Sequence, residues 1–503
     1  MRIATTYMML LSLLLQTTIT MAQSPIATSD SSLHQLKYKV EGIANRPEMK
    51  RGQWGFALVD GSSGALLLEH RSHETMVPAS TQKTITSAAA LGMLGTDYTF
   101  KTVLEHDGAV QNGQLVGNLY IRGGGDPTLG SDRFGTQSDL TAILLEWGGA
   151  LKRAGVSKVE GSIVGDAEFF EDATTPSTWN WGDIGNYYGA GANGLSVLEN
   201  TYEVFFDASG KVGSLAKFIG TNPTLPGIRF WNEMKIGTSD SGDQGYVYGA
   251  PFDENRYLRG SVPQGKGKFS IKGSLPDPAL FIAERAKQVW DSLGIHVSGK
   301  PTTTRIMRLG GMEVPGKRLK IAEHQSPPLE EIVYWLNKKS INLYAEHLLK
   351  TMGKVKFGEG TQENGLKAMT EFWSGKGLNL DGLYAFDGSG LSRYNGVTPL
   401  QLATMMRLNI SAPYFEAFWE SLPIAGDPND PGTIKSMCLK TAAAKNVRAK
   451  SGSIARVRCY TGYANTSSGK RVCFAMMANN YSCSSSEMRD WLADLMVAIA
   501  ELP

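Results

Sequence analysis

Strand patterns at both ends of the chain restrict its fold more than any other feature. Near the N-terminus, "WGFALVD" and "ALLLEH" are joined by "GSSG", which predicts a β-hairpin. Near the C-terminus, "NVRAKSG", "ARVRCYTGYANT" and "RVCFAMMANNY" predict three more strands. Helical apolar spacing precedes the hairpin and follows the last strand. We therefore expect one antiparallel sheet, flanked by helices and built from both ends of the chain.

The middle of the chain has a different composition. From about residue 105 to 285 it is rich in Gly, Asp and short β-like runs, and helical patterns return after that, as in "LEEIVYWLNKKSINLYAEHLLKTMG". We expect residues 27–104 and 286–503 to form one α+β domain with a helical subdomain. Residues 105–285 are then an inserted β-rich segment, which we expect to form two small domains.

The first residues predict export. Arg2 is followed by the apolar run "MMLLSLLLQTTIT", which is too short to span a bilayer, and then by small residues that end at Ala22. We interpret residues 1–22 as a signal peptide, with a buried first helix as the alternative. No later segment reaches about 18 apolar residues, so we expect no transmembrane segment in the mature chain.

Composition excludes some partners. The net charge of +2 gives no electrostatic reason to expect nucleic-acid binding. The seven His residues are scattered without HExxH or paired Cys/His spacing, so we expect neither a metal nor a cofactor. The cysteines, Cys438, Cys459, Cys473 and Cys483, permit two disulfides in an exported protein, and buried thiols are the alternative.

A predicted helix start carries the first candidate catalytic residues. In "VPASTQKTIT", Pro78 suits a first helical turn, and the Ala-rich continuation favours a buried helix. Ser80 and Lys83 are three residues apart, so they share one helix face. A serine hydroxyl needs a base to become a nucleophile, and a lysine is a base only when it is neutral. Because burial and a second cation both lower a lysine pKa, we expect another cation in this site.

The sequence "VRAKSGSIARV" supplies that cation at the end of a predicted strand. Lys450, Ser451 and Gly452 form the only Lys-[Ser/Thr]-Gly in the chain. An exposed strand edge can bind a peptide-like substrate, and the N–H of Ser453 can join that of Ser80 as an oxyanion hole. Lys450 and the two serine hydroxyls can hold a substrate carboxylate.

A third motif is Ser340-Ile341-Asn342. The serine can relay a proton to a leaving amine, and the amide can orient Lys83. Two further Ser-x-x-Lys matches begin at Ser214, in the Gly-rich middle, and at Ser467, in a predicted strand turn. Neither lies at the start of a helix, so we assign them no chemistry.

Together the three motifs resemble those of the penicillin-interacting serine enzymes. The 260 residues between Ser80 and Ser340 exceed the spacing in β-lactamases. The chain is similar to the D-alanyl-D-alanine carboxypeptidases/endopeptidases of the class C low-molecular-mass penicillin-binding proteins, which carry domains inserted between the first two motifs. The stretches "YIRGGGDPTL", "WNWGDIGNYYGA", "DGSGLSRYN" and "SLPIAGDPNDPGT" share this likeness.

The resemblance implies a penicillin-binding/serine β-lactamase-like fold and a periplasmic enzyme. It also implies hydrolysis of peptidoglycan stem peptides and cross-links through a serine acyl-enzyme, with β-lactam antibiotics as covalent inhibitors. The catalytic residues it assigns are Ser80, Lys83, Ser340, Asn342 and Lys450, and the substrate-binding residues are Ser451, Gly452, Ser453, Arg393 and Asp166. The family usually has Thr at the position of Ser451, which keeps a hydroxyl.

Several alternatives remain open from the sequence alone. Arg393 and Asp166 resemble positions that contact the peptide side chain, and Asp166 could pair with the free amine of diaminopimelic acid. The structural alternatives are an ion pair for Arg393 and a turn or cap for Asp166. For the whole chain, a serine β-lactamase or esterase and a non-catalytic cell-wall-binding sensor are the other candidates. The preference between carboxypeptidase and endopeptidase action, and the oligomeric state, do not follow from the sequence.

Overall fold

The two ends of the chain meet in one antiparallel sheet, as predicted. The structure, a computed structural model, describes residues 26–265 and 267–503, so the expected signal peptide lies outside the described residues. The strand order is β19-β20-β21-β1-β2, and every neighbouring pair is antiparallel. The strands are β1 (Gln53–Asp60), β2 (Leu66–His70), β19 (Arg448–Ile454), β20 (Val457–Asn465) and β21 (Arg471–Asn479).

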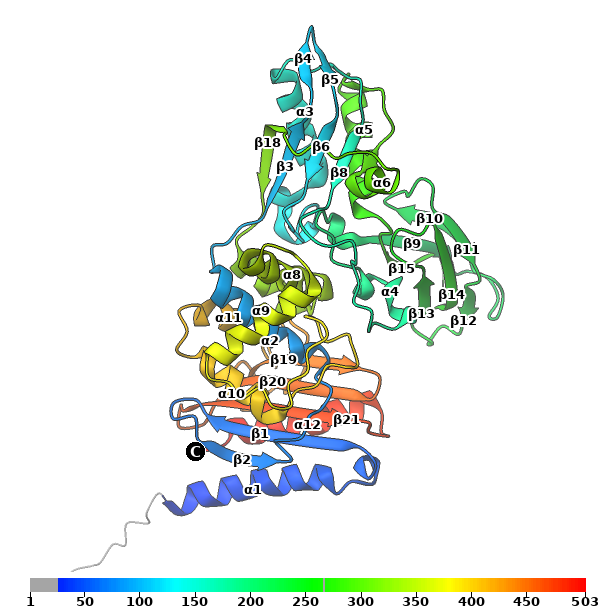
Figure 1. Cartoon of the computed structure of the whole chain (residues 1–503). Helices are drawn as coiled ribbons and strands as arrows, with labels where there is room; N and C mark the ends of the chain where they lie inside the picture. Colours follow the sequence, from blue (N-terminus) through cyan, green and yellow to red (C-terminus); the bar gives the residue numbers. More distant parts are fainter. Residues whose placement is uncertain (1–25, 266) are drawn as a thin grey trace, which may run out of the picture.

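Helices cover both faces of this sheet (Figure 1), which explains why its central strands are almost continuously apolar. Along β1, Ala57 and Val59 enter one core, and Trp54, Phe56 and Leu58 enter the other. The helices of this domain are α1 (Ile26–Ala44), α2 (Gln82–Leu94), α7 (Leu329–Lys339), α8 (Asn342–Phe357), α9 (Gln362–Gly375), α10 (Pro399–Asn409), α11 (Phe415–Ser421) and α12 (Ser485–Ala500). Helices α1 and α12 contribute to one core, and α2 with α7–α10 contributes to the other.

The inserted segment holds two groups of strands. The first, farthest from the five-stranded sheet in Figure 1, contains a mixed sheet in the order β17-β8-β6-β3-β18 and a small sheet in the order β16-β7-β5-β4. Its elements are β3 (Lys101–His106), β4 (Ala109–Gln111), β5 (Gln114–Val116), β6 (Leu119–Arg122), α3 (Leu140–Arg153), β7 (Lys158–Val159), β8 (Ile163–Asp166), α5 (Pro278–Ser292), β16 (His296–Val297), β17 (Thr302–Thr303), α6 (Thr304–Leu309) and β18 (Leu319–Gln325).

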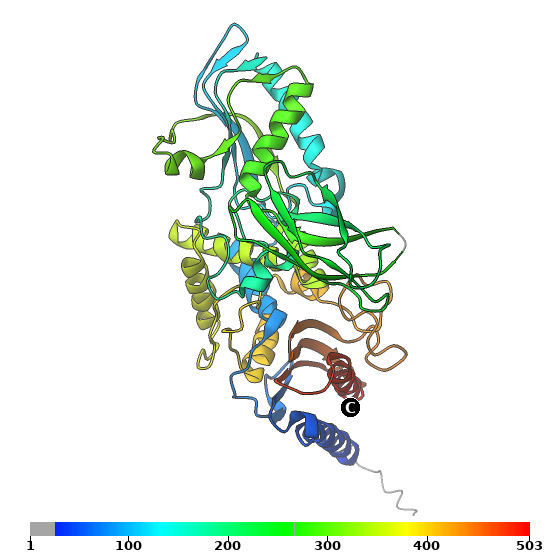
Figure 2. The same ribbon diagram turned by 90° about the vertical axis from the view of Figure 1, so that its right-hand side faces the viewer.

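The second group is almost entirely β. Its sheets have the orders β10-β9-β15 and β11-β14-β12, with β13 paired to β14. Figure 2 shows them, in green, beside the helices of the domain that contains the five-stranded sheet. The elements are α4 (Trp181–Ile184), β9 (Thr201–Asp207), β10 (Lys217–Asn222), β11 (Arg229–Asn232), β12 (Lys235–Gly237), β13 (Gln244–Tyr248), β14 (Asn255–Pro263) and β15 (Lys268–Ser274).

The limits of the insertion differ from those expected at residues 105 and 285. Strand β3 begins at Lys101 and pairs with β18, which ends at Gln325, so the outgoing and returning chains lie side by side. The expected limit of 285 falls inside α5, whose buried face packs with the core of the insertion. A helical pattern does not reveal which core its apolar face will join. We therefore place the insertion at residues 101–325.

Two further features concern cysteines and membranes. The four cysteines are free thiols, and Cys459 and Cys473 are buried in the five-stranded sheet. Within the described residues, every helix is too short or too polar to span a bilayer.

Candidate active site

Ser80 lies in a tight turn at the start of α2. A 3-10 turn covers Ala79–Thr81, and the α-helix continues from Gln82. Ala79 has a φ of 46°, in the left-handed region that residues with a Cβ rarely adopt. Such a conformation persists only where the surroundings enforce it, and it often occurs at functional sites. It turns the chain just before Ser80, whose side chain is half-buried.

Strand β19 lies against this turn. It is an edge strand of the five-stranded sheet, and within the described residues its outer edge pairs only through an isolated bridge between Arg448 and Ile424. A Cβ built on Gly452 would lie 2.5 Å from the Pro78 carbonyl oxygen and 2.9 Å from the Thr81 nitrogen. The close approach leaves no room for a side chain, which explains the glycine of the Lys-Ser-Gly motif. The Ser453 and Ser80 backbones can then face one reacting carbonyl, as an oxyanion hole requires.

Lys83 is fully buried beside Ser80. Its Nζ donates hydrogen bonds to Ser80 Oγ (3.1 Å), Asn342 Oδ1 (2.6 Å) and the Ser389 carbonyl oxygen (2.7 Å). Burial lowers the pKa of Lys83 to about 7, although the carboxylates of Asp387 and Glu346 oppose this shift. A substantial neutral fraction near neutral pH makes this amine a competent base.

The second lysine is also buried and close to a serine. Lys450 Nζ donates to Ser340 Oγ (2.9 Å) and to the Ser451 carbonyl oxygen (2.7 Å). Burial, and then the charge of Lys83, hold the pKa of Lys450 well below its usual value. Because repulsion between two cations is mutual, the pair disfavours the state in which both are charged. The expected second cation is present, but burial alone lowers the pKa of Lys83, and the charge of Lys83 lowers the pKa of Lys450 instead.

Ser340 lies at a break that the helical pattern does not reveal. The stretch from 329 to 353 predicts continuous helix, but the structure ends α7 at Lys339 and begins α8 at Asn342. Ser340 terminates α7 with a left-handed φ of 59°. The break lets its hydroxyl meet Lys450, while Asn342, at the first turn of α8, meets Lys83.

Two buried carboxylates behind Lys83, Glu346 and Asp387, were not predicted from the sequence. Glu346 accepts hydrogen bonds from the Gly388 N–H (3.1 Å) and the Ser389 N–H (2.8 Å), which hold the Ser389 carbonyl against Lys83. Burial and the nearby charge of Asp387 raise the pKa of Glu346 to about 7. The available signal was position: Glu346 is four residues after Asn342, so both share a face of one helix.

Two residues of the insertion, Tyr188 and Trp179, form hydrogen bonds with the site. Asn342 Nδ2 donates to the Tyr188 carbonyl oxygen (2.7 Å), which fixes the orientation of its amide toward Lys83. Trp179 Nε1 donates to Asp387 Oδ2 (2.8 Å). Neither contact could be inferred from sequence spacing, because each joins residues more than 150 positions apart.

The substrate-binding candidates of β19 lie along its outer edge. Ser451 Oγ is 2.7 Å from Thr433 Oγ1, so two hydroxyls stand together beside Lys450, while Ser453 is exposed. Arg393, in the loop after "DGSG", is exposed and donates to the Ala455 carbonyl oxygen (3.4 Å). No ion pair of Arg393 occurs in the described part of the chain, so the structure does not supply the ion-pair alternative.

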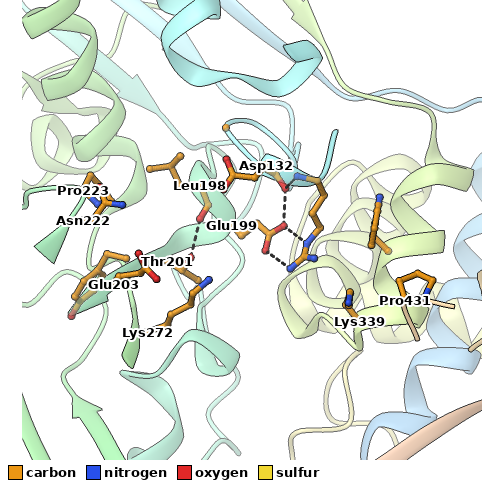
Figure 3. A pocket seen from close by; sticks show the side chains of 15 residues that line it. Asp132, Leu198, Glu199, Thr201, Glu203, Asn222, Pro223, Lys272, Lys339 and Pro431 are labelled. Carbon is orange, nitrogen blue, oxygen red and sulfur yellow. Dashed lines mark hydrogen bonds and ion pairs between the residues drawn. The ribbon is translucent and has the colours of Figure 1, made fainter. Parts of the chain in front are cut away.

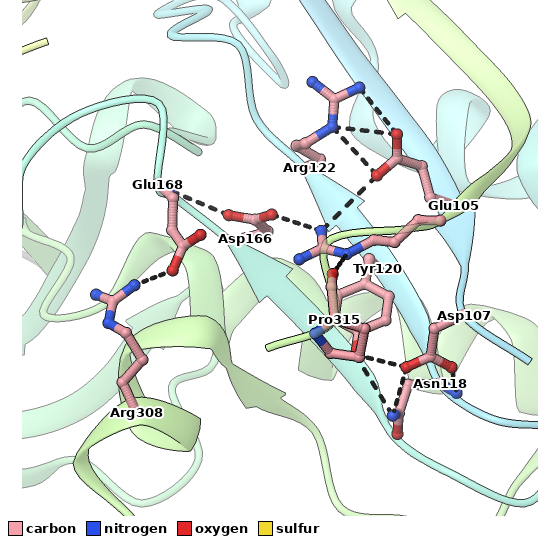
Figure 4. A network of polar contacts seen from close by, with 10 residues as sticks. Glu105, Asp107, Asn118, Tyr120, Arg122, Asp166, Glu168, Arg308 and Pro315 are labelled. Carbon is pink, nitrogen blue, oxygen red and sulfur yellow. Dashed lines mark hydrogen bonds and ion pairs between the residues drawn. The ribbon is translucent and has the colours of Figure 1, made fainter. Parts of the chain in front are cut away.

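Asp166 lies elsewhere. It is 3% exposed, at the end of β8, and Arg318 Nη1 donates to its Oδ2 (2.6 Å). Its other oxygen accepts from the Glu168 N–H (3.0 Å), as in a turn. Figure 4 shows it among the charged side chains of Glu105, Arg122 and Glu168. Among the described residues, no hydrogen bond connects it to the Ser80 group. Asp166 therefore has both a turn hydrogen bond and an ion pair with Arg318, and a contact with a substrate amine stays a prediction.

The fold and the site define a class of enzyme: a serine hydrolase in which a buried lysine is hydrogen-bonded to a serine, with a second serine–lysine pair on an edge strand. The chain belongs to the D-Ala-D-Ala carboxypeptidase 3 (S13) family, whose model matches residues 36–502. This confirms the predicted class, a serine-type D-Ala-D-Ala carboxypeptidase.

Similar proteins are consistent with this family assignment. A D-alanyl-D-alanine carboxypeptidase from Actinomadura sp. (strain R39) is 29% identical over 474 residues, covering 90% of this chain and 82% of the relative. Penicillin-binding protein 4 (DacB) from Haemophilus influenzae has a similar crystal structure, with a TM-score of 0.76, 24% identity, and coverage of 92% of this chain and 97% of that one. A complex of that protein with a novel β-lactam gives a TM-score of 0.71 at 23% identity, with the same coverage. These matches confirm the predicted fold class.

Proposed function

We propose that the chain cleaves D-alanyl peptide bonds of peptidoglycan through an acyl-enzyme on Ser80. The observation that supports this most is the pair of serine–lysine hydrogen bonds, Lys83 to Ser80 and Lys450 to Ser340. One pair can activate a nucleophile and the other can deliver a proton to a leaving group.

The first step is acylation. Neutral Lys83 takes the proton of Ser80 as Oγ attacks the carbonyl carbon of the penultimate D-alanine. The N–H groups of Ser80 and Ser453 stabilise the oxyanion. The C–N bond breaks as Ser340 gives its proton to the leaving nitrogen, and Lys450 replaces that proton. The products are an ester on Ser80 and a free amine.

The second step is hydrolysis of the ester. A water molecule attacks its carbonyl carbon and gives one proton to the basic lysine–serine network, and Ser80 leaves with a proton. The hydroxyls of Ser451 and Thr433, beside Lys450, are placed to hold the carboxylate that follows the scissile bond.

A β-lactam presents an amide carbonyl and a carboxylate in a similar arrangement. Ser80 would open the ring, but the amine would remain tethered to the acyl group and obstruct water. The complex of the Haemophilus influenzae relative with a β-lactam supports this proposal. The substrate and the signal-like residues 1–22 both favour a periplasmic enzyme. N-terminal sequencing of the exported protein should begin near Gln23.

Acylation provides the direct test. Purified protein incubated with benzylpenicillin should gain a single adduct by intact mass, and peptide mapping should place it on Ser80. Ser80→Ala should gain none. Ser467→Ala, which removes the serine of another Ser-x-x-Lys match, should be acylated as the wild type is. An adduct elsewhere, or none on the folded wild type, would refute the proposal.

A further inference from the structure

The second group of strands in the insertion forms two packed sheets, and the outer faces of these sheets differ in chemistry. Val204 of β9 and Leu258 of β14 share one core between the sheets. On the outside of the first sheet, Glu203 and Lys272 pair in register and line a cavity beside α7 (Figure 3). The outside of the second sheet, which β11, β13 and β14 form, is aromatic instead. A contiguous group of large apolar side chains in water often marks a binding surface.

Aromatic side chains from three neighbouring strands form one row across this second sheet. Tyr257 of β14 pairs in register with Trp231 of β11 on one side and with Tyr248 of β13 on the other. Paired residues project to the same face of a sheet, and Tyr246 joins them because it lies two residues before Tyr248. Trp231, Tyr246 and Tyr257 are 52%, 42% and 36% exposed. We call these four residues the aromatic face.

Two rings of the aromatic face are held nearly parallel. The planes of Trp231 and Tyr257 differ by 16°, and their ring centroids are 6.4 Å apart. Trp231 Nε1 donates a hydrogen bond to Asn255 Oδ1 (3.1 Å), which restricts the indole ring. The two rings therefore offer apolar surfaces that are already ordered, so a flat ligand would bind them at a small cost in side-chain entropy.

A neutralised arginine lies among the rings. The guanidinium carbon of Arg259 is 5.5 Å from the ring centroid of Tyr257 and 5.8 Å from that of Tyr248. Its Nε and Nη2 each donate to a carboxylate oxygen of Glu233 (3.1 Å). The polar groups at the centre of the face are therefore an ion pair, which offers hydrogen-bonding atoms without a net charge that would select an ionic ligand.

This combination fits a carbohydrate. A pyranose ring has C–H groups on one face and polar groups around its rim, and the negative face of an aromatic ring attracts the partly positive C–H hydrogens. The rim can exchange hydrogen bonds with tyrosine hydroxyls and with the carboxylate of Glu233. A protein partner would favour aliphatic side chains as well, but the branched aliphatic side chains of the described strands β11, β13 and β14 are buried on the other face. They are Val247, Leu258 and Val262.

Hydrogen bonds join the aromatic face to the catalytic site. The N–H of Val247, in β13, donates to Asn186 Oδ1 (3.0 Å). Two residues after Asn186, the Tyr188 carbonyl oxygen accepts from Asn342 Nδ2 (2.7 Å). Tyr187, between them in the sequence, is exposed and adds a further ring to this connection. A polymer bound on the aromatic face would therefore be held at a fixed place relative to the serine–lysine pairs.

We propose that the aromatic face is a carbohydrate-binding site for a β-1,4-linked chain of N-acetylhexosamines, the polysaccharide part of a cell wall. The rings would stack on the sugars and on the methyl groups of their acetamido substituents. The inference goes beyond the proposed function, because binding the polysaccharide requires neither Ser80 nor a peptide. Such a site would keep the enzyme on the wall between successive cleavages.

The test uses a ligand without a peptide. A β-1,4-linked hexamer of N-acetylglucosamine, which contains no D-alanine, is titrated into the full-length protein and its binding is measured by calorimetry. Ser80→Ala should bind the hexamer as the wild type does. Trp231→Ala and Tyr257→Ala should each raise Kd at least about tenfold, because each removes one stacking surface. Trp231→Phe keeps a ring and should raise Kd less.

Tyr38→Ala is the matched control. Tyr38 is 79% exposed on α1, so this variant also removes an exposed ring, but from another part of the molecule. It should leave Kd unchanged, and benzylpenicillin should acylate each variant except Ser80→Ala at the wild-type rate.

Three results would overturn the inference: a wild-type protein that does not bind the hexamer, alanine variants of the aromatic face that bind it with the wild-type Kd, or equal losses in Trp231→Phe and Trp231→Ala. A wild-type protein that binds the hexamer but is not acylated by benzylpenicillin would instead refute the proposed function and leave the carbohydrate site in place.

Discussion

At the scale of single residues, the site depends on keeping Lys83 partly neutral. A lysine in water has a pKa of about 10.4, so only a very small fraction would be a base near neutrality. Complete burial lowers the pKa of Lys83 to about 7, against the opposing charges of Asp387 and Glu346. The two carboxylates therefore limit how far the pKa of Lys83 falls. Glu346 also accepts a hydrogen bond from the Ser389 N–H, and this holds the Ser389 carbonyl oxygen where it accepts a hydrogen bond from Lys83.

The pH dependence of acylation follows from this balance. The rate should rise with pH through about 7, because the neutral form of Lys83 is the proposed base. Lys83→Arg should lower the rate by at least about 100-fold, since a guanidinium cannot lose its proton in this range. Stopped-flow measurement of acylation by a fluorescent penicillin between about pH 5 and 9 would give the profile.

Glu346→Gln tests the carboxylate behind the base. Replacing Glu346 with a neutral amide removes a charge that raises the pKa of Lys83. The acidic limb of the pH–rate profile should therefore move to lower pH, by less than about one unit, because Glu346 has a pKa of about 7 and is itself partly protonated in this range. The same stopped-flow profile measures the shift, and Glu346→Asp, which keeps the charge, should move the limb less. If the acidic limb of the pH–rate profile does not move in Glu346→Gln, Glu346 acts only on the loop that contains Ser389.

At the scale of secondary-structure elements, the packing of β19 on the start of α2 positions the reacting groups. Gly452→Ala would place a Cβ 2.5 Å from the Pro78 carbonyl oxygen, so the strand and the nucleophile turn must separate. We expect a loss of unfolding free energy of about 1–3 kcal/mol and an acylation rate reduced about 100-fold. Urea unfolding and penicillin acylation would measure the two effects.

Gly375→Ala is the control for that substitution. Gly375 ends α9, and a methyl group added there would meet no neighbouring group within 4 Å, so the substitution should change neither quantity appreciably. If Gly452→Ala loses stability without losing acylation, the close contact would serve packing alone and not the alignment of the two N–H groups.

The elements also show how far the sequence could be interpreted. The central strands β1, β20 and β21 were predicted because both of their faces are buried and their runs are strongly apolar, whereas β2 is largely exposed and was predicted from the hairpin turn before it. The break between α7 and α8 was not, because the apolar spacing continues across it and Ser340 adopts its left-handed φ through tertiary contacts. The serine–lysine pairs follow from local spacing, whereas Glu346 and Tyr188 come to the site from distant segments or from a helix face without a motif.

At the scale of the whole molecule, α8 connects the insertion to the site. Along one face, Tyr344 donates to Glu199 (2.8 Å), His347 Nδ1 lies 2.8 Å from the Gly125 carbonyl oxygen, and Lys350 donates to the Ala173 carbonyl oxygen (2.6 Å). These side chains are spaced three residues apart, so they project from one side of the helix. Asn342 and Glu346 lie on the same helix, and the insertion therefore helps to fix the catalytic groups.

Trp179→Phe tests this coupling through one hydrogen bond. Trp179 is 5% exposed and donates to Asp387, which also accepts from the N–H groups of Gly390 and Ser392. Phe fills most of the same space but leaves the carboxylate one donor short, at a cost of about 1–3 kcal/mol. The "DGSG" loop should loosen over Lys83, and acylation should slow by about three- to tenfold.

Trp231→Phe is the control. It removes a hydrogen bond from Trp231 Nε1 to Asn255 that lies within the insertion, so its acylation rate should match the wild type. Equal rates for both variants would mean that the insertion shapes the substrate path without supporting the catalytic lysine.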